Sequence, residues 1–368
     1  MNWRVIAALA AGLAVAGCGG NPFDNAPECG GNPLAGGPGC TPAPTPTPTP
    51  TPEGGPGALP GTPAPAANTP ITRYEALDEG TGNGYAQGFT FDAVSNTYTV
   101  DNLAFDGGND YRKRLGQPVD RLGGYEVYEA AAEVRDPQTG VAIPQFQHKM
   151  LAGVSSTGRT EFAIVRTGAY RDYGFGGFII RRNDTFVRPP TTPDIPRDER
   201  QAAYSGNYAA IRDFKGRSGL EYATGTMEIA IDFEDFNRGD AVKGSVRNRQ
   251  ILDANGNNIT ASVLAAMDAK FDKNGTGPGS TQLPALLFKV GPGAINANGE
   301  IGGLLDSTVF DYNGDRPRVV GYEAGNYYGI VSGPNADEVV GVIVIEAEDP
   351  RIDGVTVRET GGFILYRP

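Results

Sequence analysis

The clearest secondary-structure signal in the chain is Thr224-Gly225-Thr226-Met227-Glu228-Ile229-Ala230-Ile231-Asp232-Phe233. Apolar side chains occupy every second position from Met227 onward, with polar or small residues between them. A period of two is that of a β-strand with one buried face. The stretch therefore predicts a strand whose Met227 face packs inward and whose Glu228 face meets solvent.

Similar stretches lie on both sides of this one. The sequence predicts eight strands, at 203–211, 224–233, 241–251, 284–290, 299–307, 319–331, 338–347 and 360–367. One helix is predicted over 260–271, where apolar residues follow helical spacing. Antiparallel strands at this spacing, joined by Gly and Asn turns, fit a closed up-and-down barrel whose interior is filled by side chains. We expect this barrel over residues 201–368.

Residues 71–187 also indicate β-structure. Alternating runs flank turn signals at Val94-Ser95-Asn96 and at Asp136-Pro137-Gln138-Thr139-Gly140, and a third pair of strands is expected at 161–166 and 173–182. The Pro-rich residues 188–200 are interpreted as a linker. The predicted fold is all-β, with a β-rich handle domain preceding an eight-stranded antiparallel barrel.

Residues 18–70 consist mainly of Gly, Pro, Thr, Asn and Ala. Prolines alternate with Thr or Ala over 41–52, which excludes helix and sheet and favours an extended polyproline II spacer. We interpret this segment as a disordered Pro/Thr-rich stalk that carries the folded domains away from a membrane. Disordered filler without a function in its length is the alternative.

The N-terminus indicates export. Arg4 precedes an apolar run from Val5 to Val15, as in a secretory signal. Val15-Ala16-Gly17 followed by Cys18 resembles the bacterial lipobox, which implies a signal peptide over 1–17 and a lipidated, acylated Cys18. Gly19 in place of Asp implies sorting to the outer membrane. An ordinary signal peptide that contains a cysteine is the alternative.

The other two cysteines, Cys29 and Cys40, lie in the stalk. An exported compartment is oxidising, so a Cys29–Cys40 disulfide is expected, and pairing between molecules is the alternative.

Charge and motif content restrict the function. A formal net charge of −12 argues against nucleic acid or an anionic membrane surface as a partner. The single histidine, His148, is expected to be a strand residue with its hydrogen bonds made. Three Asn-Gly stretches fail the calcium-loop pattern and are predicted turns. We expect no catalytic residue, metal site or cofactor, with a paired-carboxylate hydrolase as the alternative.

Four stretches resemble the β-barrel domain of transferrin-binding-protein-B-like surface lipoproteins. They are Tyr204-Ser205-Gly206-Asn207-Tyr208, Ile231-Asp232-Phe233 with Gly244 to Arg249, Tyr327-Tyr328-Gly329 with Gly333 to Gly341, and Gly361-Gly362-Phe363. Full members of that family carry two lobes, and this chain has room for one.

The resemblance implies a lipid-anchored outer-membrane protein, displayed at the cell surface, that captures a protein or an iron- or haem-bearing ligand for an outer-membrane transporter. A periplasmic orientation is the alternative for its location. A structural or interaction lipoprotein of the envelope, with no soluble ligand, is the alternative for its function.

A filled barrel leaves loops at one rim, or the handle, for contact with a partner. Two rim loops combine aromatic residues with cations, which are enriched at binding hot spots. The candidate binding residues are Phe214, Lys215 and Arg217 in one loop, and Tyr312 and Arg316 in the other. The alternative is that Phe214 and Tyr312 only cap the barrel.

Overall fold

The computed structural model describes residues 59–368 apart from 79–83, 85, 107–109, 170, 193, 195, 197–199, 235–240 and 290–293. Cys18, Cys29, Cys40, the signal segment and most of the stalk lie outside the described residues. The lipidation, disulfide and stalk assignments therefore stay predictions. Within the described residues, no helix has the length and apolar character needed to cross a membrane.

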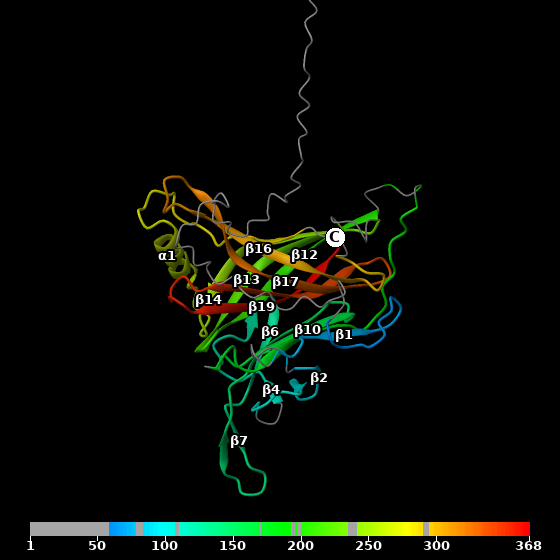
Figure 1. Cartoon of the computed structure of the whole chain (residues 1–368). Helices are drawn as coiled ribbons and strands as arrows, with labels where there is room; N and C mark the ends of the chain where they lie inside the picture. Colours follow the sequence, from blue (N-terminus) through cyan, green and yellow to red (C-terminus); the bar gives the residue numbers. More distant parts are fainter. Residues whose placement is uncertain are drawn as a thin grey trace, which may run out of the picture.

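The described part of the handle is a nine-stranded antiparallel sheet with a separate hairpin. The sheet strands are β1 (Ile71–Tyr74), β2 (Gly88–Asp92), β3 (Thr97–Asp101), β4 (Asp110–Arg112), β5 (Arg121–Leu122), β6 (Tyr125–Ala130), β9 (Lys149–Val154), β10 (Thr160–Arg166) and β11 (Gly176–Arg182). Their order is β1-β11-β10-β9-β6-β4-β3-β2, with β5 paired to β6. The hairpin of β7 (Glu133–Arg135) and β8 (Ala142–Pro144) projects from the side of the handle away from the barrel (Figure 1).

The barrel domain is a closed sheet of eight antiparallel strands with one helix. The elements are β12 (Gln201–Phe214), β13 (Arg217–Asp232), β14 (Val242–Leu252), α1 (Thr260–Phe271), β15 (Leu286–Phe288), β16 (Glu300–Asp311), β17 (Arg318–Ser332), β18 (Glu338–Glu348) and β19 (Thr356–Tyr366). Each strand pairs with the next, and β19 pairs with β12 from Ser205↔Tyr366 to Phe214↔Val357. The predicted fold class is confirmed.

The barrel core follows the period of two from which the fold was predicted. Met227 is 1% exposed and packs in the barrel interior, whereas Glu228 is exposed. The strand β13 begins at Arg217, seven residues before its expected start. The strand β15 is shorter than expected, at three residues. It begins two residues after Pro284, which has no N–H to donate to a ladder.

An apolar interface joins the handle to the outer wall of the barrel. Phe162 and Phe178 of the handle pack in one buried cluster with Tyr328, Val342 and Ile364 of the barrel. Phe178 and Tyr328 stack with ring centroids 6.2 Å apart. The two domains therefore share one hydrophobic core, in addition to the cores that each has alone.

Buried ion pairs cross the same interface. Arg166 of β10 donates to Glu75 at 2.9 Å and to Thr360 of β19 at 2.8 Å. Arg358 of β19 pairs with Asp213 of β12 at 3.3 Å, and its second nitrogen lies 4.0 Å from Glu75. Two cations and two carboxylates thus alternate across the junction, so each buried charge lies near a counter-charge.

Part of the segment that composition places in the stalk packs on the folded domains. Leu59 is buried in the handle–barrel cluster, and Thr62 donates its N–H to Thr72 of β1 at 3.0 Å. Arg182 donates to the carbonyls of Ala66 and Thr69 at 2.8 and 2.9 Å. Residues 59–62 therefore cover the free edge of β1, which protects it from pairing with another chain.

We predict that Met227→Asp prevents folding, because it places an unpaired carboxylate in the barrel core. Glu228→Lys, one residue away on the solvent face, should change the free energy of unfolding by less than about 0.5 kcal/mol. Far-UV circular dichroism and thermal unfolding of both variants check this. A folded Met227→Asp protein with the midpoint of the wild type would contradict the assigned faces.

Candidate functional site: the barrel rim and its junction with the handle

One end of the barrel carries the loops that the sequence singled out. The β12–β13 hairpin, the β14–β15 connection with α1, the β16–β17 loop and the β18–β19 loop all lie at this end. Figure 1 shows α1 here, away from the C-terminus. We call this end the α1 rim.

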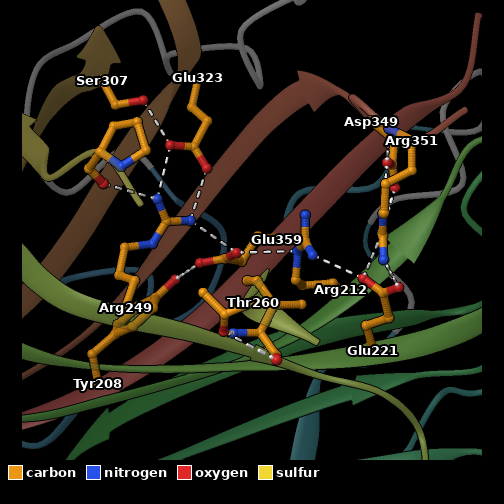
Figure 2. Close-up of polar contacts among 12 residues, drawn as sticks. Tyr208, Arg212, Glu221, Arg249, Thr260, Ser307, Glu323, Asp349, Arg351 and Glu359 are labelled. Carbon is orange, nitrogen blue, oxygen red and sulfur yellow. Dashed lines mark hydrogen bonds and ion pairs between the residues drawn. The ribbon is translucent and has the colours of Figure 1, made fainter. Parts of the chain in front are cut away.

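Just inside the α1 rim, charged side chains fill the barrel (Figure 2). Arg249 of β14 donates to both carboxylate oxygens of Glu323 on β17 at 2.8 Å and to Glu359 on β19 at 3.0 Å. Tyr208 donates to Glu359 at 2.8 Å, and Ser307 donates to Glu323 at 2.6 Å. These bidentate and charge-assisted contacts are of the strong kind.

The network extends toward the rim. Arg212 donates to Glu221 at 2.8 Å and lies 3.3 Å from Glu359. Arg351, in the β18–β19 loop, donates to both oxygens of Glu221 at 2.7 and 3.0 Å and pairs with Asp349 at 2.6 Å. We call these paired side chains, from Arg249, Glu323 and Glu359 to Arg351, the ionic layer. Each of its carboxylates has an arginine partner.

The pKa values of the ionic layer reflect this pairing. Burial alone disfavours the charged form of Glu323, but the neighbouring Arg249 outweighs burial and lowers the pKa of Glu323. Burial likewise opposes the charge of Arg249, and Glu323 and Glu359 raise its pKa well above the ordinary value. Glu323 is therefore ionised at neutral pH, and the arginine that it shares with Glu359 balances its charge.

An apolar lid closes the α1 rim above the ionic layer. Phe214, Ala347 and Val357 form a buried cluster, and Tyr322 packs against both this cluster and the barrel core. Tyr322 also meets Phe271 of α1 edge-on, with ring centroids 6.1 Å apart. Side chains thus fill the mouth of the barrel at this rim, as the size of an eight-stranded barrel leads one to expect.

The β16–β17 loop fastens the C-terminus of α1 to the barrel. Asn313 donates its side-chain amide to the carbonyl of Lys270 at 2.9 Å and accepts the N–H of Lys273 at 2.9 Å. Tyr312 donates its N–H to the carbonyl of Phe271 at 2.7 Å. These contacts satisfy carbonyls that a helix end leaves unpaired.

The structure places the five predicted binding residues in two groups. Phe214 is 5% exposed and belongs to the lid, while Lys215 and Arg217 are exposed beside it, with the Arg217 guanidinium 5.6 Å from the Phe214 ring. Tyr312 is half-buried, and Arg316 is exposed on the β16–β17 loop. The two aromatic side chains have packing roles, and binding by any of the five stays a prediction.

A cavity of about 280 Å³ lies beside the second group. Its apolar wall combines Met267 and Phe271 of α1 with Leu283, Phe310 and Tyr312. The carboxylates of Asp268 and Asp272 also line it, but they accept backbone N–H groups of Ser280, Thr276 and Gly277 and so hold the neighbouring loop in place.

The β12–β13 hairpin, which carries Phe214, Lys215 and Arg217, contacts the handle, and the sequence did not indicate this contact. Gly216 of the β12–β13 hairpin donates to the carbonyl of Asp172 at 2.8 Å, and Gly219 donates to Gly168 at 2.9 Å. Three residues beyond Asp172, Phe175 joins an aromatic cluster with Phe105 and Phe146, with ring centroids 5.7 to 5.8 Å apart. These rings come from distant segments, so no local pattern could have revealed the cluster.

His148 lies just before β9 and is fully buried. Its Nδ1 is 3.1 Å from the carbonyl oxygen of Phe146, so Nδ1 carries the proton. Burial lowers the pKa of His148 to about 4, which keeps the ring neutral at physiological pH. Its Nε2 has no hydrogen-bond partner in the described residues. Within those residues, no group of three or more His, Cys, Asp or Glu side chains is arranged to hold a metal ion.

We predict that Arg249→Met destabilises the protein by about 3–5 kcal/mol, because it leaves Glu323 buried without its arginine. The unpaired carboxylate should then have a raised pKa, so the stability of the variant should increase as the pH falls from 8 to 5. Chemical denaturation at both pH values measures this.

The matched control is Arg247→Met, on the same strand but exposed, which should cost less than about 0.5 kcal/mol at either pH. Equal losses in the two variants would show that the ionic layer does not need Arg249.

The chain is similar to several solved structures, although no family model and no curated protein matches it. One is transferrin binding protein B of Haemophilus parasuis Hp5, at 12% identity and a TM-score of 0.31, covering 76% of this chain and 45% of that one. Another is isotype 1 transferrin binding protein B of serogroup B Neisseria meningitidis, at 12% identity and a TM-score of 0.28, covering 65% and 35%. The haemoglobin receptor HpuA of Kingella denitrificans aligns at 12% identity and a TM-score of 0.28, covering 80% of this chain and 82% of that one. The chain spans less than half the length of these two transferrin binding proteins.

Proposed function

We propose that the protein is a lipid-anchored outer-membrane lipoprotein, displayed at the cell surface, that captures a protein or an iron- or haem-bearing ligand without catalysis. The proposal rests on the structure of the α1 rim. A filled, rigid barrel end presents exposed cations beside an aromatic cluster of the handle. Binding loops on a rigid scaffold are the usual arrangement for recognition.

The state of Glu323 argues against a role for this residue as a general acid. Glu323 and Glu359 are a buried pair of carboxylates that share Arg249 beneath the apolar lid. A general acid needs a carboxyl whose pKa is raised toward neutrality. Arg249 instead lowers the pKa of Glu323, so this pair is suited to holding the barrel together.

The location rests on the N-terminal sequence. The lipobox-like segment before Cys18 supports acylation, and the alternating prolines of 41–52 support a spacer that extends from the membrane. Capture of a soluble protein outside the cell requires the binding face to stand clear of the surface, and for this reason we favour outward display.

We predict that Cys18→Ser abolishes anchoring and leaves unprocessed precursor, because the lipid can no longer be attached. Membrane fractionation and intact mass measurement check this. For the wild type, protease added to whole cells should digest the protein. Digestion only after the outer membrane is broken would instead place the domains in the periplasm.

We also predict that whole cells displaying the full-length protein retain a soluble protein from growth medium or host fluid. Cells that lack the gene, the negative control, should not retain it. Purified haemoglobin, transferrin and free haem serve as defined probes, since the similar structures are named for the first two. We expect saturable binding with a Kd of about 1 μM or below. Absence of binding to the probes and to medium proteins, with co-purification of an envelope protein, would favour the structural alternative.

A further inference from the structure

We infer that Phe105, Phe146 and Phe175 of the handle, together with Arg171, Lys215 and Arg217, form one composite surface. It binds a protein whose contact face carries carboxylates around an apolar recess. The inference rests on the proposed capture function and specifies where capture occurs and what kind of partner fits. The evidence lies in backbone strain, in charge and in the contacts between the handle and the barrel.

Phe105 is displayed at a conformational cost. Its φ is +60°, in the left-handed region that bulky residues rarely adopt, and its side chain is 56% exposed. The conformation is held on both sides, since Phe146 donates its N–H to the carbonyl of Phe105 and the next residue, Asp106, is buried and accepts from Tyr111. Backbone strain that the surrounding contacts hold in place is typical of a functional position.

The same type of strain recurs across the surface. Asp172 has a φ of +46° and presents its carbonyl to Gly216 of the β12–β13 hairpin. This fixes Arg171, whose side chain is 90% exposed, next to the hairpin that carries Lys215 and Arg217. Two non-glycine residues at positive φ thus hold the aromatic and the cationic parts of the surface in place.

One segment of the handle links the aromatic part of the surface to the cationic part. Thr167 donates its N–H to the carbonyl of Phe175 at 3.0 Å, and so closes the handle segment that reaches the hairpin. Within that segment, the ring of Tyr173 lies 4.0 Å from the buried Arg358 guanidinium of β19. The segment therefore rests on the barrel at its centre while Phe175 and Arg171 lie on either side.

Charge determines the kind of partner. The three exposed cations outnumber the partly exposed carboxylates near them, since Asp172 lies 3.9 Å from Arg171 and Glu346 interacts with Lys215. This local excess of positive charge occurs in a chain with a formal net charge of −12. A carboxylate-bearing face is drawn to this site and repelled by the rest of the surface, which fixes the orientation of docking. The exposed ring of Phe105, beside the half-buried Phe146 and Phe175, then supplies the apolar anchor, and the arginines supply polar ones.

Two variants of the full-length protein test the inference. Phe105→Gly removes the ring and the strain together, so the midpoint of thermal unfolding should stay the same or rise while affinity falls at least tenfold. The combined variant Arg171→Glu, Lys215→Glu and Arg217→Glu should slow association at least tenfold and reverse its dependence on salt, because the changed surface repels a carboxylate-bearing face. The probe is haemoglobin, transferrin or the purified medium protein, whichever the wild type binds in the capture experiment.

Each variant has a matched control. Leu115→Ser removes a fully exposed apolar side chain elsewhere on the handle. The combined variant Lys243→Glu, Arg247→Glu and Lys273→Glu makes the same change in charge on exposed barrel positions away from the hairpin. Both controls should bind as the wild type does.

If the wild type binds its probe and both test variants bind it equally well, the composite surface is wrong and the capture function stands. Loss of binding only in a separate Arg316→Glu variant would also overturn the inference and move the site to the β16–β17 loop. If the wild type binds no probe and no medium protein, the capture function fails and this inference fails with it.

Discussion

Two aromatic rings pack against neighbouring glycines of β19, Tyr208 on Gly361 from inside the barrel and Phe162 on Gly362 from the handle, and the rest of the structure depends on these contacts. A methyl group on Gly361 would lie 2.3 Å from the ring of Tyr208 inside the barrel, and one on Gly362 would lie 2.2 Å from the ring of Phe162 of the handle. Tyr208 holds Glu359 in the ionic layer, and Phe162 anchors the handle. A barrel wall free of side chains at this point is therefore what lets one strand close the barrel and dock a second domain.

The sequence predicted the barrel because its signals are local. Alternation in residues 224–233 and the apolar spacing of α1 depend on the period of each element, so the strands and the helix appear close to where they were expected. The structure of the residues just before the handle was less predictable. Residues 59–69 have the composition of a stalk, yet the guanidinium of Arg182 holds their carbonyls, and a distant arginine leaves no trace in local composition.

The docking of the handle had a signal that alternation alone does not convey. In β18, Val339 to Ile345 form a continuous apolar run, and every residue of this run is buried. Such a run indicates a strand that is covered on both faces, here by the barrel core and by the handle. In contrast, the positive φ of Phe105 and the approach of Asp172 to the hairpin result from tertiary contacts, and a phenylalanine carries no sequence signal for that conformation.

A binding surface that spans two domains is useful only if the domains keep their relative position. Apolar packing against β18 and β19 and the alternating charges of Arg166, Glu75, Arg358 and Asp213 oppose movement at this junction. A partner that docks across such a junction loses little free energy to ordering the receptor. The buried charges thus serve recognition indirectly, because they hold the handle segment and the β12–β13 hairpin together before any partner arrives.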